Sequence, residues 1–190
     1  MSAQDMHAAL AGLLYEKSYQ EGKFTLTSGK KSDYYFDCKQ TALHPQGAYL
    51  LGRIFLDMIQ ASRMPIQGIG GMTLGADPLI SAVTVLSYVQ GTPLPGFIVR
   101  KEAKGHGTGQ YLEGMANFTP GQMVCMLEDV VTTGGTLLTA CSRVEQAGFK
   151  IGLILCVLDR EEGGGRNIRS AGYRMESIFT RKELIHAAGK

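Results

Sequence analysis

Apolar residues follow two alternating patterns over the last two thirds of the chain. Short apolar runs predict strands at 66–70, 96–99, 123–127, 151–158 and 176–179. Helical spacing predicts helices over about 77–89 and 136–147, between these runs. The runs at 124–127 and 151–157 are continuously apolar, which is typical of strands covered on both faces. The alternation predicts an α/β domain with a mostly parallel sheet, where ligands bind beyond the carboxyl ends of the strands.

The first 60 residues carry a different pattern. Met6, Leu10, Leu13 and Leu14 recur at helical spacing, and Gly22 is a candidate stop for that helix. Two short strands are predicted at 24–27 and 34–37, around the polar turn 28–31. Pro45 suits the first turn of a second helix, whose apolar positions are Leu50, Leu51, Ile54, Phe55 and Met58.

Size and charge limit the function classes. With 190 residues, the chain is expected to form a single domain, 1–190. The charged fraction of 19% and the hydrophobic fraction of 44% exclude a disordered acidic tail and a membrane protein. A net charge of +2 argues against a nucleic-acid partner, so any anion is expected to bind in a local pocket. Glycine is in excess, at 25 residues. This indicates positions that need a positive φ or a close approach of the backbone to another group.

Cysteine usage and the chain's beginning point to the cytoplasm. Cys38, Cys125, Cys141 and Cys156 form no C-x-x-C pair, which argues against a zinc or redox motif. We therefore expect reduced thiols in a cytoplasmic protein. The first residues lack a basic segment followed by a long apolar one, so no signal peptide is expected. No apolar run approaches the length of a membrane-spanning helix.

The most informative segment is 124–136, Val-Cys-Met-Leu-Glu-Asp-Val-Val-Thr-Thr-Gly-Gly-Thr. An apolar strand is predicted to end in Glu128 and Asp129, and a glycine–threonine loop then opens a helix. Glycines let backbone N–H groups turn toward a phosphate, and the helix N-terminus attracts anions. The threonine hydroxyls add donors, and the two carboxylates can accept hydrogen bonds from a vicinal diol. Phosphate and diol together describe a ribose 5-phosphate; the plainer interpretation is a strand, a turn and a capped helix.

A second segment, 100–110, combines cations with glycines. Arg100, Lys101, Lys104 and His106 fall within seven residues, and Gly105, Gly107 and Gly109 alternate through the end of the segment. A mobile cationic loop suits a diphosphate leaving group, because it can close over the developing charge and open again. The alternative is a solvated surface loop in which Glu102 neutralises part of the charge.

The segment at 124–136 resembles the PRPP-binding signature of the type I phosphoribosyltransferases. The resemblance implies a central parallel sheet flanked by helices, with a small N-terminal hood to which residues 1–40 contribute. It also implies that Glu128 and Asp129 contact the ribose hydroxyls. PRPP binding then extends over the following loop, which is Val130, Val131, Thr132, Thr133, Gly134, Gly135 and Thr136.

Other segments resemble the orotate phosphoribosyltransferases more closely. Residues 100–107 match that family's catalytic loop R-K-x-x-K-x-H-G. The match implies that Arg100, Lys101, Lys104 and His106 bind PRPP, and that Lys104, His106 and Asp129 are catalytic. In this family the loop completes the neighbouring subunit's site, so a homodimer is implied. Residues 24–35 resemble the family's F-x-L-x-S-G-x-x-S segment, and 158–160 resemble its L-D-R.

The case for orotate from the residues themselves is thinner. Arg160 could offer a guanidinium fork to the orotate carboxylate, and Tyr35 or Phe36 could pack against the ring, with Thr132 nearby. Arg160 could instead be a surface cation that pairs with Glu161 or Glu162. The aromatic triplet 34–36 could equally be ordinary strand packing.

The chain departs from the family's best-known pattern in two places. Thr27 stands where many bacterial relatives carry a lysine, and Met72-Thr73 stand where many carry Tyr-Lys. Lys30 and Lys31 could compensate for these missing cations. The glycine triplet 163–165 is unexplained by the sequence beyond a flexible flap near the base.

The resemblance implies a reaction. Orotate N1 attacks C1 of PRPP as diphosphate departs, with Mg²⁺ held mainly by substrate and water rather than by protein ligands. A transferase for another nucleobase would keep the ribose motif but lack the loop at 100–107. A non-catalytic PRPP-sensing regulator would be expected to have a basic nucleic-acid surface. Association with a separate decarboxylase stays open.

Overall fold

The computed structural model describes residues 1–25, 31–103 and 111–189, and its main feature is one six-stranded sheet. The strand order is β5-β4-β3-β6-β7-β8. The parallel strands are β3 (Ile69–Met72), β4 (Gly96–Val99), β6 (Met123–Val131), β7 (Lys150–Asp159) and β8 (Met175–Thr180). The short β5 (Leu112–Glu113) pairs antiparallel with β4 and forms one edge.

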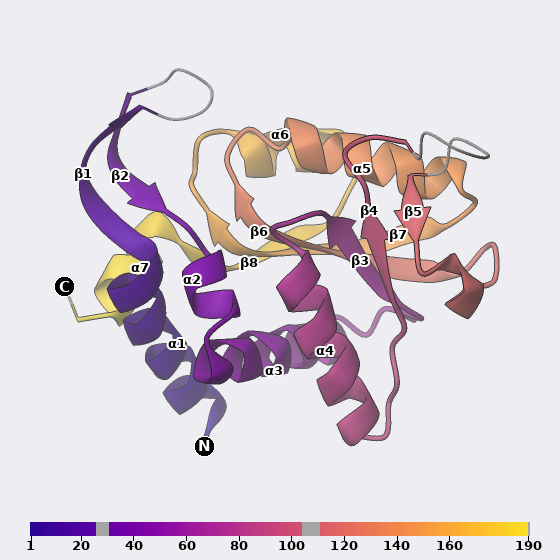
Figure 1. Ribbon diagram of the computed structural model, residues 1–190, viewed down its shortest axis with the longest axis horizontal. Coiled ribbons are helices and arrows are strands. Elements are labelled where there is room, and N and C mark those ends of the chain that lie inside the picture. Colours follow the sequence, from indigo (N-terminus) through magenta and orange to yellow (C-terminus); the bar gives the residue numbers. More distant parts are fainter. Residues whose placement is uncertain (26–30, 104–110, 190) are drawn as a thin grey trace.

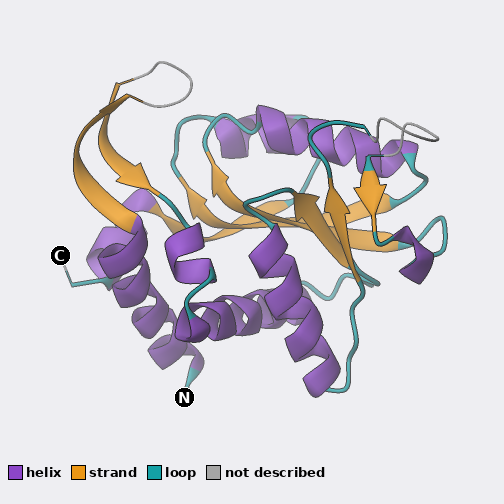
Figure 2. Ribbon diagram, viewed as in Figure 1, coloured by secondary structure: helices purple, strands orange, loops and turns teal. Residues whose placement is uncertain are grey.

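Helices cover both faces of this sheet (Figures 1 and 2). On one side lie α1 (Ala3–Ser18), α2 (Lys39–Ala42), α3 (Pro45–Ala61), α4 (Asp77–Val89) and α7 (Arg181–Ala187). On the other lie α5 (Gly135–Gln146) and α6 (Gly164–Ser170), and the 3-10 turn Met115–Asn117 follows β5. This arrangement confirms the predicted α/β class with a mostly parallel sheet.

Alternation along the central strands creates two cores. Leu127 and Leu155 are fully buried on the α1–α3 side, whereas Met126 and Ile154 are fully buried against α5. Side chains alternate between the faces of a strand, so a strand covered on both sides needs apolar residues at every position. The continuously apolar runs in β6 and β7 meet this requirement.

The amino-terminal hairpin forms a separate two-stranded sheet, the hood, beside the main one (Figure 1). Its strands are β1 (Tyr19–Thr25) and β2 (Lys31–Phe36), paired antiparallel. The predicted helix stop at Gly22 is wrong, since α1 ends at Ser18 and Gly22 lies within β1. Tyr19 explains the earlier end: it is extended and buried, and its ring stacks on Tyr34 of β2 at 5.3 Å.

Two strand boundaries also differ from the prediction. The strand expected at 66–70 is β3, which begins at Ile69. The strand expected at 123–127, with Glu128 and Asp129 at its end, is β6, which continues to Val131 because Val131 still pairs with Asp159 of β7. Glu128 and Asp129 therefore lie inside a strand. The carboxyl ends of β3, β6 and β7 lead into segments 73–76, 132–134 and 160–163. Because these strands are parallel neighbours, the three segments lie together along the edge of the sheet formed by the carboxyl ends of its strands.

Among the described residues, none of the helices combines the length and the apolar character that crossing a membrane requires.

Candidate active site

The loop from β6 to α5 forms a small hollow of about 100 Å³. It is lined by Glu128 and by residues 130–137, which include all three threonines of the motif. Gly134 adopts φ 82° and caps α5, whose twelve residues place a helix N-terminus at the hollow. Unpaired N–H groups and the helix dipole make such an end favourable for an anion. The predicted phosphate-binding residues Thr132–Thr136 are thus brought together.

The segment after β7 holds this loop in place. The N–H of Gly164 donates to the carbonyl of Thr132 at 2.9 Å, and Nδ2 of Asn167 donates to the carbonyl of Thr133 at 3.0 Å. A Cβ on Gly164 would lie 2.5 Å from Cγ1 of Val131 and 2.6 Å from the Thr132 carbonyl oxygen. Gly164 and Gly165 are buried at the start of α6, so they are packing positions rather than the flexible flap expected from the sequence.

The acid pair lies between two loops. Glu128 lines the hollow and is 8% exposed, and its Oε1 accepts from the N–H of Asp129 at 3.1 Å. Burial, with the nearby Asp129 carboxylate adding to it, raises the pKa of Glu128 well above its ordinary value. A Cβ on Gly75 would lie 2.5 Å from Cγ of Asp129, so the loop after β3 lies directly against this carboxylate. A ribose bound at the pair would have the phosphate hollow on one side and segment 73–76 on the other.

Met72 and Thr73, which stand where many relatives carry Tyr-Lys, lie at the end of β3 and directly after it, and both are engaged within the protein. Met72 is buried in the core on the α5 side, and the hydroxyl of Thr73 donates to Oδ2 of Asp77 at 2.8 Å. Thr27 and Lys30 lie outside the described residues.

A cation that the sequence analysis missed lies near Asp129. Nζ of Lys39, at the start of α2, pairs with Oδ1 of Asp37 at 2.6 Å. The hydrogen bond that Lys39 donates to Asp37 raises the pKa of Lys39, and the Asp129 carboxylate contributes to the same shift. The available signal was the sequence Asp-x-Lys directly after the aromatic triplet, but no family motif marked it.

The stem of the cationic loop is well defined. The N–H of Arg100 donates to the carbonyl of Tyr111 at 2.7 Å, and its guanidinium pairs with Glu113 at 3.0 Å. Arg143 of α5 donates to the carbonyl of Arg100 at 2.7 Å, which ties the stem to the helix of the phosphate loop. The Arg100 side chain is therefore held at the stem, Lys101 is exposed, and Lys104 and His106 lie outside the described residues.

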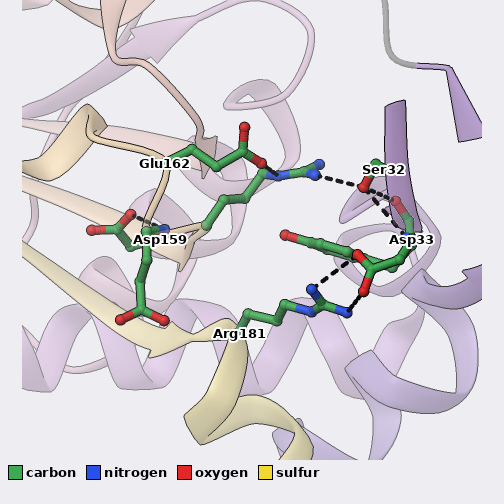
Figure 3. A network of polar contacts seen from close by, with 8 residues as sticks. Ser32, Asp33, Asp159, Glu162 and Arg181 are labelled. Atoms are coloured by element: carbon green, nitrogen blue, oxygen red, sulfur yellow. Dashed lines mark hydrogen bonds and ion pairs between the residues drawn. The ribbon is translucent and has the colours of Figure 1, made fainter. Parts of the chain in front are cut away.

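Arg160 connects the sheet edge to the hood. Its Nε donates to Oε1 of Glu162 at 2.8 Å and its Nη2 donates to Oγ of Ser32 at 3.2 Å (Figure 3). The guanidinium carbon also lies 4.3 Å from the centre of the Tyr34 ring. The alternative pairing with Glu162 is therefore present, although the side chain is buried rather than at the surface.

Tyr35 and Phe36, the two residues expected to pack against the orotate ring, differ in exposure. Tyr34 and Phe36 are buried, whereas Tyr35 is 42% exposed and packs near Phe24, with ring centres 5.6 Å apart. Consecutive residues of a strand point to opposite faces, so Tyr35 and Phe36 cannot share one. The aromatic ring that contacts Arg160 is Tyr34.

Comparisons with known proteins identify close relatives. The chain is 44% identical to the orotate phosphoribosyltransferase of Nostoc sp. over 175 residues, covering 92% of this chain and 83% of the relative. It is 43% identical to that of Thermosynechococcus vestitus, covering 96% and 95%. The crystal structure of the Mycobacterium tuberculosis enzyme in complex with PRPP superposes with a TM-score of 0.78 at 31% identity, covering 94% of this chain and 98% of that one. No family model matches the chain.

Gly164→Ala is expected to destabilise the protein by about 1–3 kcal/mol, because the added methyl group overlaps backbone and a buried valine. Urea unfolding measures this, and calorimetry should show weaker binding of inorganic phosphate. The control is Gly12→Ala in α1, where nothing lies within 4 Å and a gain of about 0.5–1 kcal/mol is expected. Equal stability of the two variants would contradict the packing argument.

Glu128→Gln is expected to stabilise the protein more as the pH rises. An acid whose pKa is raised on folding binds its proton more tightly in the folded state, so wild-type stability falls as pH rises above the unfolded value. The amide carries no such penalty. Unfolding curves at about pH 4 should coincide, and those at about pH 8 should separate in favour of the variant. Glu176→Gln, which alters an exposed carboxylate, is the control; parallel pH profiles for wild type and Glu128→Gln would refute the shift.

Proposed function

Since the chain belongs to the orotate phosphoribosyltransferase family, we propose that its active site is the edge of the sheet formed by the ends of β3, β6 and β7. The enzyme transfers the 5-phosphoribosyl group of PRPP to orotate, which gives orotidine 5′-phosphate and diphosphate in pyrimidine biosynthesis. One observation carries the placement of the site: Glu128 lines the phosphate hollow while Asp129 abuts Gly75 on the adjacent loop. The acid pair thus joins a phosphate subsite to a second anion subsite.

PRPP fits this arrangement in one direction. Its 5-phosphate enters the hollow at 132–136, where helix N–H groups and threonine hydroxyls are donors. Its ribose hydroxyls meet Glu128 and Asp129. The raised pKa of Glu128 favours its protonated form, which can donate a hydrogen bond as well as accept one. The diphosphate then extends toward the backbone of 73–76 and toward Lys101, with Lys39 a further cation on the Asp129 side.

Orotate lies between the ribose and the hood. Arg160 offers its guanidinium to the orotate carboxylate; its contacts with Glu162 and Ser32 use two of five N–H donors. Thr132 approaches the base from the phosphate loop. The backbone N–H of Arg160 donates to the carbonyl of Val131, the residue before Thr132, at 3.0 Å. The side chains of Tyr35 and Phe36 point to opposite faces of β2. We therefore expect the ring of only one of them to contact the base.

The reaction needs charge stabilisation rather than a protein nucleophile. Orotate N1 forms a bond to C1 of the ribose while the bond from C1 to the diphosphate oxygen breaks. Positive charge develops on the ribose ring, and Asp129 offsets it. Negative charge develops on the departing diphosphate, where we place Lys101, Lys104 and His106.

Magnesium fits the site as a substrate-bound ion. Among the described residues there is no group of three or more His, Cys, Asp or Glu that could cage a metal. Asp129 could add a carboxylate oxygen, and the main ligands would be diphosphate and ribose oxygens and water. When bound, the ion would neutralise part of the charge of the diphosphate.

We also infer a homodimer from an exposed apolar face on α3, α4 and the adjoining loops. Its large exposed side chains are Leu43, Tyr49, Leu74, Val85, Tyr88 and Val89. A groove of about 530 Å³ runs between α3 and α4 within this face. Leu74 immediately precedes Gly75, which touches Asp129, so the face reaches the active-site edge. A second copy seated here would lie next to this site, in keeping with the loop's expected action on the neighbouring subunit.

The thiols fit a reducing compartment. All four cysteines are free and buried, and burial raises the pKa of Cys38 and Cys156, which keeps these thiols unreactive. This supports the proposed cytoplasmic location.

Orotate absorbance at its ultraviolet maximum is expected to fall when PRPP and Mg²⁺ are added to the folded enzyme. Asp129→Asn should lower kcat about 100-fold, because the variant cannot offset the ribose charge. The control is Asp57→Asn, which alters a partly buried carboxylate on α3 paired with Arg53. No absorbance change with wild type would overturn the function; full activity of Asp129→Asn would overturn the role of that residue.

The wild-type protein is expected to have twice the 20.5 kDa chain mass in light scattering. Tyr88→Glu places a charge in the exposed apolar face and should give the single-chain mass with reduced activity. Lys182→Glu, on the exposed side of α7, is the control and should remain a dimer. A single-chain mass for the wild type, or a dimer of unchanged affinity for Tyr88→Glu, would exclude this interface.

A further inference from the structure

The hood is fastened to the body by an arginine from the carboxyl-terminal helix. Arg181, the first residue of α7, binds Asp33 of β2 through two hydrogen bonds, of 3.0 Å from Nη1 to Oδ1 and 2.9 Å from Nη2 to Oδ2 (Figure 3). Its Nη2 also donates to the hydroxyl of Tyr19 at 3.2 Å. A bidentate arginine–carboxylate pair fixes the relative orientation of both groups. Arg181 therefore links β2 to the start of α7, alongside the core packing of Tyr34 and Phe36.

Tyr34 is held between two guanidinium groups. The guanidinium carbon of Arg181 lies 4.0 Å from the ring centre, and that of Arg160 lies 4.3 Å from it. Both distances are within cation–π range, in which a guanidinium is attracted to the negative face of the ring. The ring is 3% exposed, and its hydroxyl oxygen is buried with no hydrogen-bond partner among the described residues. The contact to Arg160 is thus made by the ring face, not by the hydroxyl.

Each arginine has its own carboxylate. The buried Arg160 is paired with Glu162, and the more exposed Arg181 is paired with Asp33, so two cations can share the ring without an unpaired buried charge. The consequence for Arg160 is a fixed position: Glu162 and Ser32 hold its edge, and the ring of Tyr34 supports its face.

We propose that Arg181 and Tyr34 are positioning residues for the base subsite: Arg181 fixes the hood through Asp33, and Tyr34 holds the Arg160 guanidinium where it meets the carboxylate of the pyrimidine. This inference rests on the proposed function, because it takes Arg160 to be the carboxylate ligand. It assigns part of base recognition to the carboxyl-terminal helix, which contributes no other residue to the site described above.

Orotidine 5′-phosphate, the product, and uridine 5′-phosphate, which lacks only its carboxylate, test this directly. Calorimetry should show that the wild type binds orotidine 5′-phosphate more tightly. Tyr34→Leu and Arg181→Gln should weaken its binding about 10-fold or more while changing uridine 5′-phosphate binding less than about twofold. Tyr34→Phe keeps the ring and should retain most of the preference. Arg174→Gln removes an exposed arginine next to β8 and is the matched control.

Kinetics give a second readout. In Arg181→Gln the KM for orotate should rise about 10-fold, with the KM for PRPP within about twofold of wild type. Equal weakening of both nucleotides, a parallel rise in both KM values, or Tyr34→Phe behaving like Tyr34→Leu would overturn the proposal. If Tyr34→Leu does not fold, Arg181→Gln and Asp33→Asn carry the test, because both leave the core ring in place. A wild type that is inactive with orotate would instead refute the proposed function.

Discussion

The pairing of β6 with β7 beyond the acid pair is the constraint on which the site depends. Val131 still pairs with Asp159, so Glu128 and Asp129 are strand residues in fixed orientations rather than a mobile strand end. This position buries Glu128, raises its pKa and brings Asp129 against the loop after β3. It also places the phosphate loop and the segment after β7 so close together that Gly164 leaves no room for a side chain. One stretch of parallel ladder thus determines the electrostatics of the acid pair and the packing of two loops.

Glycine at these places has two separate uses. At Gly134 it supplies the left-handed conformation that turns the chain into α5, so backbone N–H groups face an anion. At Gly75 and Gly164 it allows one segment to lie against another: the first against a carboxylate, the second against backbone. The composition predicted close approach by backbone, but only the structure distinguishes approach to a ligand from approach to the protein itself.

Local patterns could be predicted from the sequence, and long-range contacts could not. The helix at 77–89 and the strand at 96–99 agree with the structure because their apolar periodicity and their ends lie within the segments themselves. The end of α1 was misplaced because Tyr19 is drawn into a strand by Tyr34, fifteen residues away. The link between Arg181 and Asp33 spans 148 residues and leaves no trace in either local sequence. Lys104 and His106, outside the described residues, stay predictions from resemblance.

The two halves of the site differ in how the chain encodes them, and this explains how far each could be recognised. The ribose-phosphate half comes from one continuous segment, 128–136, so its spacing alone indicates phosphate and diol. The base half combines β2, the segment after β7 and the start of α7, through Tyr34, Arg160 and Arg181. No single segment of that half carries its chemistry, so the base could be inferred only through family resemblance. The same separation allows contacts around the base to change without disturbing the phosphate loop, because the described contacts of Ser32 and Asp33 go to Arg160 and Arg181 rather than to residues 132–136.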